Sequence, residues 1–269
     1  MGSRRNFVFP TFWQAITLLV FLIFLLMLNE ALAVWVGIQP QDVVSSPLIN
    51  AIVNLLGFGF VTRLGFLRTG ASFQDVFPLR RVPVLSLAAV FLTVLGLQIL
   101  GSELDNLLRS LSPAFKNNSL AGLFENSKAE ELILFIVILG PIYEEFLFRG
   151  LLVFGFSRNY GRIKAICLSA LLFGFMHVDP ARIIFATLFG MVLAWVVLET
   201  GSLWPSLCGH VLNNLLPFLA GLIPVAIPGF NSPGVGRILE QPLWFDLLGI
   251  GLVASGILIF MARNRRIFN

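Results

Sequence analysis

Polar side chains interrupt the apolar stretches of this chain at three places. Glu144 and Glu145 follow the apolar run 132–139, and the two histidines of the chain, His177 and His210, lie late in two further apolar runs. An ionisable side chain inside a membrane span costs about 2.5–3.5 kcal/mol on insertion scales, so such residues face the interior of a helix bundle and usually mark function. These four residues are therefore the first candidates for chemistry.

The spacing around the two glutamates predicts different tasks for them. On a helix, Glu145 and Arg149 are four residues apart and can form an ion pair. Glu144 points about 100° away from Glu145 and can meet another group. Pro141 has no N–H to donate, so we expect a kink in the helix where water can enter. The alternative interpretation is that both carboxylates lie at the membrane interface, with Arg149 at its boundary.

Each histidine has a companion four residues away. Phe173 precedes His177 at helical spacing and can wall its ring, while His210 and Asn214 project from one helix face. A lone histidine in a span is commonly a hydrogen-bond partner between helices, and that interpretation stays open for each. Taken together, a carboxylate, two imidazoles and an amide can activate water and stabilise an oxyanion.

The composition predicts that helices crossing a membrane position these groups. Hydrophobic residues make up 57% of the 269 residues and charged residues 12%, against roughly 25% charged residues in soluble domains. A span needs about 20 apolar residues. We expect a single all-α membrane domain over 1–269, a polytopic bundle of about eight transmembrane helices. The candidate spans are 12–37, 47–67, 82–101, 130–153, 163–178, 181–198, 203–221 and 243–262.

The segments between spans carry further expectations. Residues 102–129 are predicted to form an amphipathic helix at the interface, and 222–242, rich in Pro and Gly, to form a loop. The spans at 163–178 and 181–198 are predicted to form a tight helical hairpin. The first span resembles a signal peptide but is too long for one, so we expect it to be uncleaved.

The basic residues predict the orientation of the chain. Thirteen of the 18 Lys and Arg residues fall on the side that also holds both termini, which indicates cytoplasmic termini by the positive-inside rule. The remaining five, on the opposite side, are Arg109, Lys116, Lys128, Arg182 and Arg237. We expect an integral multi-pass protein of the cell membrane that contacts lipids and does not bind nucleic acid.

Three motifs together resemble a known family. Glu144–Glu145 with Arg149 form EExxxR, Phe173 with His177 form FxxxH, and His210 with Asn214 form HxxxN. In this order, on successive membrane helices, they are similar to the type II CAAX prenyl endopeptidases and bacteriocin-processing (Abi, CPBP) intramembrane glutamate proteases. The resemblance covers residues 140–214.

The resemblance implies a role for each residue. Glu144 would be the general base that activates a water, and His177 would help to hold that water. His210 and Asn214 would stabilise the oxyanion, Glu145 and Arg149 would position the site through their pair, and Phe173 would support it. The implied activity is peptide-bond hydrolysis without a cofactor. The implied partner is a peptide or protein substrate, which in this family can be lipidated.

Other functions fit the same residues. Two carboxylates and two imidazoles could bind zinc in a metal-dependent membrane peptidase, although HExxH spacing is absent from the sequence. Buried Glu and His also form the proton relays of coupled transporters. A non-catalytic immunity or scaffold protein could keep the family fold. Neither cysteine belongs to a nucleophile motif, and the sequence has no GxSxG.

Overall fold

The computed structural model describes residues 8–37, 47–111, 129–177, 179–232 and 239–265. Within these ranges the regular structure is helical, and the strand-like pairing is confined to one isolated bridge between Pro228 and Ser232. The predicted all-α membrane fold is therefore confirmed.

Long helical runs occupy each of the candidate spans. They are α1 (Phe12–Trp35), α3 (Pro47–Thr69), α5 (Val84–Leu111), a continuous run through residues 129–160, α10 (Arg162–Phe175), α11 (Pro180–Thr200), α12 (Trp204–Ala220) and α13 (Leu243–Arg265). A single short turn, α4 (Phe73–Val76), lies between α3 and α5. By length and composition, α1, α5, α11 and α13 can cross a membrane.

The chain forms two compact units. Unit 1 comprises residues 1–79 and 120–172, and unit 2 comprises residues 80–119 and 173–269. The boundary falls within α10, so that Phe173 is the first residue of the second part of unit 2. The carboxylate motif lies in unit 1, and both histidine motifs lie in unit 2. The expectation of one membrane domain stays a prediction.

Unit 1 packs α3 against the helical run that carries the two glutamates. Gly65 of α3 contacts Leu151 so closely that a Cβ at this position would clash with the leucine side chain. Phe146 packs on Phe77, with ring centroids 5.2 Å apart, and Phe77 packs on Phe66 of α3 at 5.5 Å. These contacts fix the part of the run that directly follows Glu144 and Glu145.

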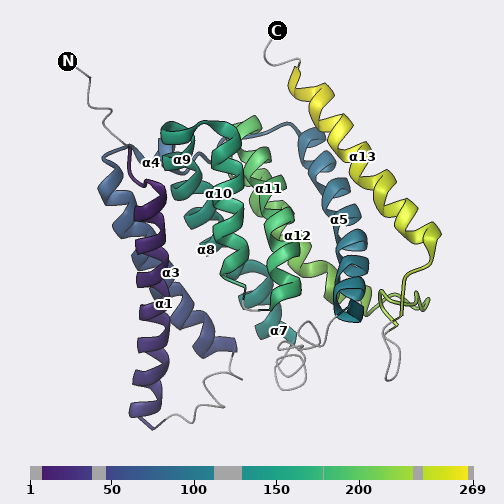
Figure 1. The fold of residues 1–269 in the computed structure, drawn as a ribbon, viewed down its shortest axis with the longest axis horizontal. Helices are drawn as coiled ribbons and strands as arrows, with labels where there is room; N and C mark the ends of the chain where they lie inside the picture. The colour runs from purple at the N-terminus through teal and green to yellow at the C-terminus, as the bar shows by residue number, and fades with distance from the viewer. Residues whose placement is uncertain (1–7, 38–46, 112–128, 178, 233–238, 266–269) are drawn as a thin grey trace. The chain divides into compact units, whose positions relative to one another are not determined.

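Unit 2 is built around α5. Figure 1 shows α13 alongside α5, and the two helices run antiparallel because Gly256 contacts Thr93 whereas Gly249 contacts Ile99. The two helices approach closely at Gly96, whose Cβ would lie 2.5 Å from the Gly249 carbonyl oxygen. The buried core of this unit joins α5, α11 and α13 through Ala89, Val90, Val94, Phe189, Leu193, Val196 and Phe260.

The interfacial helix predicted at 102–129 is wrong over its first part. Helix α5 continues without a break to Leu111, so residues 102–111 are its last turns, and residues 112–128 lie outside the described residues. A helix of 28 residues is about 42 Å long, whereas the hydrocarbon core of a bilayer is about 30 Å thick. The polar final turns can therefore extend past the apolar slab as part of the same helix.

One other local prediction is confirmed. The described part of 222–242 lacks helices and strands, and Asn231 organises it by accepting a hydrogen bond from the Ile227 N–H and donating to the Ala220 and Val225 carbonyls. The hairpin predicted for 163–178 and 181–198 stays a prediction, because residues 162–172 belong to unit 1. Within unit 2, the last turn of α10 packs on α11. Gly174 lies directly against Thr187 of α11, and its Cβ would be 2.8 Å from the Ile183 carbonyl oxygen.

The close approach of α5 and α13 predicts that Gly96→Ala destabilises the protein. The added methyl group meets the Gly249 backbone and Val253, and overpacking of this kind costs about 1–3 kcal/mol. Thermal unfolding of the purified protein in detergent should show a lower Tm. Gly251→Ala is the matched control, because a Cβ on this glycine of α13 meets nothing within 4 Å. An equal Tm for both variants would contradict the packing argument.

Candidate active site

The helical run that carries the carboxylates contains two π-helical segments. Short α7 (Ala129–Leu132) leads into a π-helical segment, η2 (Ile133–Leu139), then α8 (Gly140–Glu144), a second π-helical segment, η3 (Glu145–Leu152), and α9 (Val153–Tyr160). Pro141 stands where η2 ends, and it has no N–H with which to continue the hydrogen-bond ladder. The expected irregularity at Pro141 is therefore a change of winding, and π-helical turns occur frequently at functional sites.

Glu145 and Arg149 form the buried ion pair expected from their spacing. Arg149 Nη1 lies 3.1 Å from Glu145 Oε1, and their side chains are 1% and 0% exposed. Glu145 is the first residue of η3, so the two groups remain on one face despite the π winding. Taking two charges out of water is costly, and the cost is recovered only when both remain paired. Both groups are therefore buried within the protein. The alternative interpretation of the carboxylates as interfacial concerns depth in the membrane and stays open.

Glu144 has a different environment from its neighbour. It is the last residue of α8 and is half-buried, whereas Glu145 is fully buried. Adjacent residues on a helix face different directions, so the neighbour that pairs with Arg149 leaves Glu144 on a separate face. This difference in burial agrees with the separate tasks predicted for the two glutamates.

His177 lies just beyond the helix in which it was expected. Helix α10 ends at Phe175, and the His177 N–H donates to the Gly174 carbonyl at 2.9 Å in the turn that follows. Its ring turns back toward α10, with Nδ1 3.1 Å from the Phe173 carbonyl oxygen. A carbonyl oxygen can only accept, so Nδ1 carries the proton and Nε2 of the neutral ring is a hydrogen-bond acceptor. That nitrogen can accept a hydrogen bond from a water molecule.

Phe173 contacts both imidazoles. Its ring centroid lies 5.0 Å from that of His177 and 5.6 Å from that of His210, in edge-to-face arrangements. His210, on α12, is 3% exposed and also contacts Phe189 of α11 at 5.6 Å. Unit 2 therefore brings His177 and His210 to one phenyl ring. The FxxxH spacing predicted the contact of Phe173 with His177, but not its contact with His210. The contact of Phe189 was not predicted, because it comes from a helix without a motif.

Asn214 is oriented by its own neighbour. Asn213 Nδ2 donates to Asn214 Oδ1 at 3.0 Å, which directs the Asn214 amide nitrogen, a donor, the other way. The Asn213 carbonyl accepts a hydrogen bond of 2.7 Å from Gln98 Nε2 of α5. Neither Asn213 nor Gln98 was among the site residues predicted from the sequence. The signal available was that each is an uncharged polar residue inside an apolar run.

The described structure therefore defines two halves of the predicted site. Unit 1 pairs Glu145 with Arg149 and places Glu144 beside them, and unit 2 gathers Phe173, His177 and His210, with Asn214 one turn beyond His210. That Glu144 faces the imidazoles stays a prediction. Among the described residues, no group of three His, Cys, Asp or Glu could hold a metal ion.

The buried pair predicts that Arg149→Ala folds poorly. The change leaves the Glu145 charge buried opposite a methyl group, and breaking such a pair costs about 3–5 kcal/mol. Folded yield and Tm in detergent should both fall. The double change Glu145→Leu with Arg149→Met removes both charges and should restore the Tm, since apolar replacements of a buried pair are often neutral or stabilising. A stable, fully active Arg149→Ala protein would show that the pair is dispensable.

Comparisons with known proteins point to one family. The family described as type II CAAX prenyl endopeptidase, Rce1-like, matches residues 129–216, a stretch that contains all three motifs. Over 94 residues, the chain is 27% identical to YdiL of Bacillus subtilis (strain 168), which is described as a candidate membrane peptidase. This match covers 35% of the chain and 38% of YdiL. No solved structure matches the chain. Residues 129–216 are therefore similar to the Rce1-like family of type II CAAX prenyl endopeptidases.

Proposed function

We propose that this protein is a membrane endopeptidase in which Glu144 activates the water that hydrolyses a peptide bond. The observation that carries the proposal is the grouping of His177 and His210 around Phe173, within the stretch that matches the Rce1-like family. A pair of imidazoles and an adjacent amide, held by a turn and by helix α12, provides the hydrogen-bonding groups that amide hydrolysis needs.

The proposed reaction needs one base and an oxyanion site. The Glu144 carboxylate takes a proton from water, and the oxygen of that water attacks the carbonyl carbon of the scissile bond. The carbonyl oxygen becomes an oxyanion as the tetrahedral intermediate forms. The C–N bond then breaks, and the proton held by Glu144 passes to the leaving amine. The products are a carboxylic acid, which then loses its proton to solvent, and an amine, and Glu144 returns to its ionised form.

The imidazoles and the amide have separate roles in this reaction. His177 orients the water through Nε2, which is an acceptor because Nδ1 faces the Phe173 carbonyl. His210 and Asn214 donate hydrogen bonds to the oxyanion. Asn214 suits this role because its oxygen accepts from Asn213 and its amide nitrogen points elsewhere. These donors are neutral, so they stabilise the developing charge without adding a fixed charge to the buried site.

The substrate in this proposal is a peptide or protein that reaches the site from the membrane. The description of the matched family names prenyl endopeptidases, so prenylated peptides are one class to test, and unprenylated peptides are the other.

We also propose that both termini face the cytoplasm, since 13 of 18 basic residues fall on that side by the positive-inside rule. Protease treatment of sealed inside-out vesicles should remove tags fused to either terminus. Protection of both tags would reverse the orientation.

Substitution of the proposed catalytic groups should remove cleavage of a peptide panel by the purified protein. Glu144→Ala and His177→Ala should abolish cleavage, because the base or its water is lost. His210→Ala and Asn214→Ala should reduce kcat by about 10²–10³-fold, the usual effect of losing an oxyanion donor. Glu130→Ala is the matched control, because it removes an exposed acid at the start of the same helical run. Each variant must elute from a size-exclusion column at the volume of the parent protein and have the same Tm.

The same assay separates the glutamate mechanism from its rivals. Cleavage that requires Glu144 and persists with a strong chelator supports the proposal. Cleavage that the chelator abolishes and zinc restores would assign the site to a zinc peptidase. Full activity of Glu144→Ala would refute the role of this residue. A folded parent that cleaves no peptide in the panel would favour a transporter or scaffold.

A further inference from the structure

The turn that carries His177 is held by a capped helix start. Helix α11 begins at Pro180, directly after this turn, and Asp179 is its N-terminal capping residue. Asp179 Oδ1 accepts hydrogen bonds from the Ala181 N–H at 2.9 Å and the Arg182 N–H at 3.3 Å. One carboxylate oxygen is thus used within α11, two residues away from His177.

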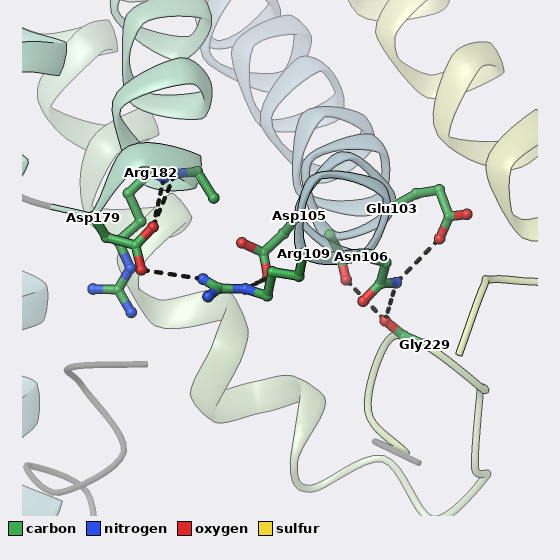
Figure 2. Close-up of polar contacts among 9 residues, drawn as sticks. Glu103, Asp105, Asn106, Arg109, Asp179, Arg182 and Gly229 are labelled. Carbon is green, nitrogen blue, oxygen red and sulfur yellow. Dashed lines mark hydrogen bonds and ion pairs between the residues drawn. The ribbon is translucent and has the colours of Figure 1, made fainter. Parts of the chain in front are cut away.

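The other oxygen of Asp179 joins the turn to a distant helix. Arg109 Nη2 of α5 lies 3.3 Å from Asp179 Oδ2, and Arg109 Nε lies 2.6 Å from Asp105 Oδ2 of the same helix (Figure 2). The side chains of Asp179 and Arg109 are 4% and 15% exposed. This shielding from water makes the pair stronger than a surface ion pair, and the second carboxylate holds the guanidinium in place.

The turn is also restrained on its other side. Gly174 lies against Thr187 of α11 with no room for a Cβ. His177 therefore lies between two fixed points, the Gly174 contact and the Asp179 cap. The first restraint joins α10 to α11, and the Arg109 pair joins the turn to α5.

Helix α5 also supports the other proposed catalytic segment. Gln98 donates to the Asn213 carbonyl on α12, next to Asn214. Arg109 lies eleven positions after Gln98, which is about 16 Å along a helix. One rigid helix thus holds both the His177 turn and the segment of α12 beside Asn214.

We propose that Arg109 is a positioning residue for His177, acting through its ion pair with Asp179. The pair fixes the turn, and with it the direction of His177 Nε2, relative to α5 and α12. Its effect on catalysis rests on the proposed function, whereas its effect on the turn does not. Residues that hold a reacting group in place can change a rate about 10²-fold through a displacement of 1 Å.

Two conservative variants remove the pair with little other change. Arg109→Gln removes the cation, and Asp179→Asn keeps an oxygen for the cap, since Asn and Asp are equally good capping residues. Asp105→Asn is the matched control, because it removes a charge beside Arg109 but keeps an oxygen that accepts from Arg109 Nε, and residue 105 lies on α5 itself and not on the turn.

Two measurements test the proposal on the purified full chain. Hydrogen–deuterium exchange of peptides covering 174–182 should rise in Arg109→Gln and Asp179→Asn and match the parent in Asp105→Asn. With a cleaved peptide, kcat should fall about 10- to 100-fold in the first two variants. KM should stay within about twofold, as expected when only the transition state is affected. Arg109→Lys, which keeps the charge, should recover part of kcat.

A double variant gives a further check. If Arg109 and Asp179 act as one unit, Arg109→Gln with Asp179→Asn should have nearly the kcat of either single variant. Parent-like exchange in both single variants would overturn the proposal, as would an equal effect of Asp105→Asn. A parent that cleaves no peptide would count against the proposed function alone, because the exchange measurement still decides whether the pair holds the turn.

Discussion

Close packing of small residues around α5 is the constraint on which unit 2 depends. Inside a membrane, the surrounding lipid is as apolar as the side chains, so helices associate through close van der Waals contact and hydrogen bonds. Gly96 lets α13 approach α5, and Gly209 lets α12 approach Val90 and Val94 of the same helix. Gly209 directly precedes His210. The contact that seats α12 on α5 therefore also sets the position of an imidazole in the candidate site.

A different constraint governs the segment with the glutamates. The charges of Glu145 and Arg149 are fully buried, so neither can lose its partner without a large cost. Their pair fixes the first turns of η3, and Glu144 is the residue that immediately precedes this fixed segment. A buried ion pair thus supports the half-buried carboxylate of Glu144, the residue directly before Glu145. The same stretch of backbone holds the ion pair and orients Glu144, the proposed base.

The environment of the histidines suits neutral hydrogen-bonding chemistry. His210 is enclosed by the edges of Phe173 and Phe189, and His177 directs Nδ1 to a backbone carbonyl. In the described structure, the acids that join the ends of these helices, Asp105 and Asp179, are engaged by Arg109. Aromatic rings contact both imidazoles, and a backbone carbonyl accepts from His177. The ion pairs hold the turn and the end of α5.

The amino-acid sequence predicted the helical spans, the pairing of Glu145 with Arg149 and the grouping of polar residues into three motifs. These features depend on local apolar runs and on helical spacing, which the residues on one segment define alone. For example, the span predicted at 243–262 is observed as Leu243–Arg265. The match of residues 129–216 to the Rce1-like family likewise follows from residues that the sequence displays.

Other features depend on contacts between segments and are visible only in the folded protein. The tertiary structure showed that α5 continues past residue 101, that π-helical turns flank α8, and that His177 lies in a turn after α10. It also assigned Gln98, Asn213 and Phe189 to the support of Asn214 and His210. Local composition could not predict the contacts of Gln98 and Phe189, because each forms only when helices far apart in the chain pack together. The same holds for Arg109 and Asp179, which are 70 residues apart and form their pair only in the folded unit.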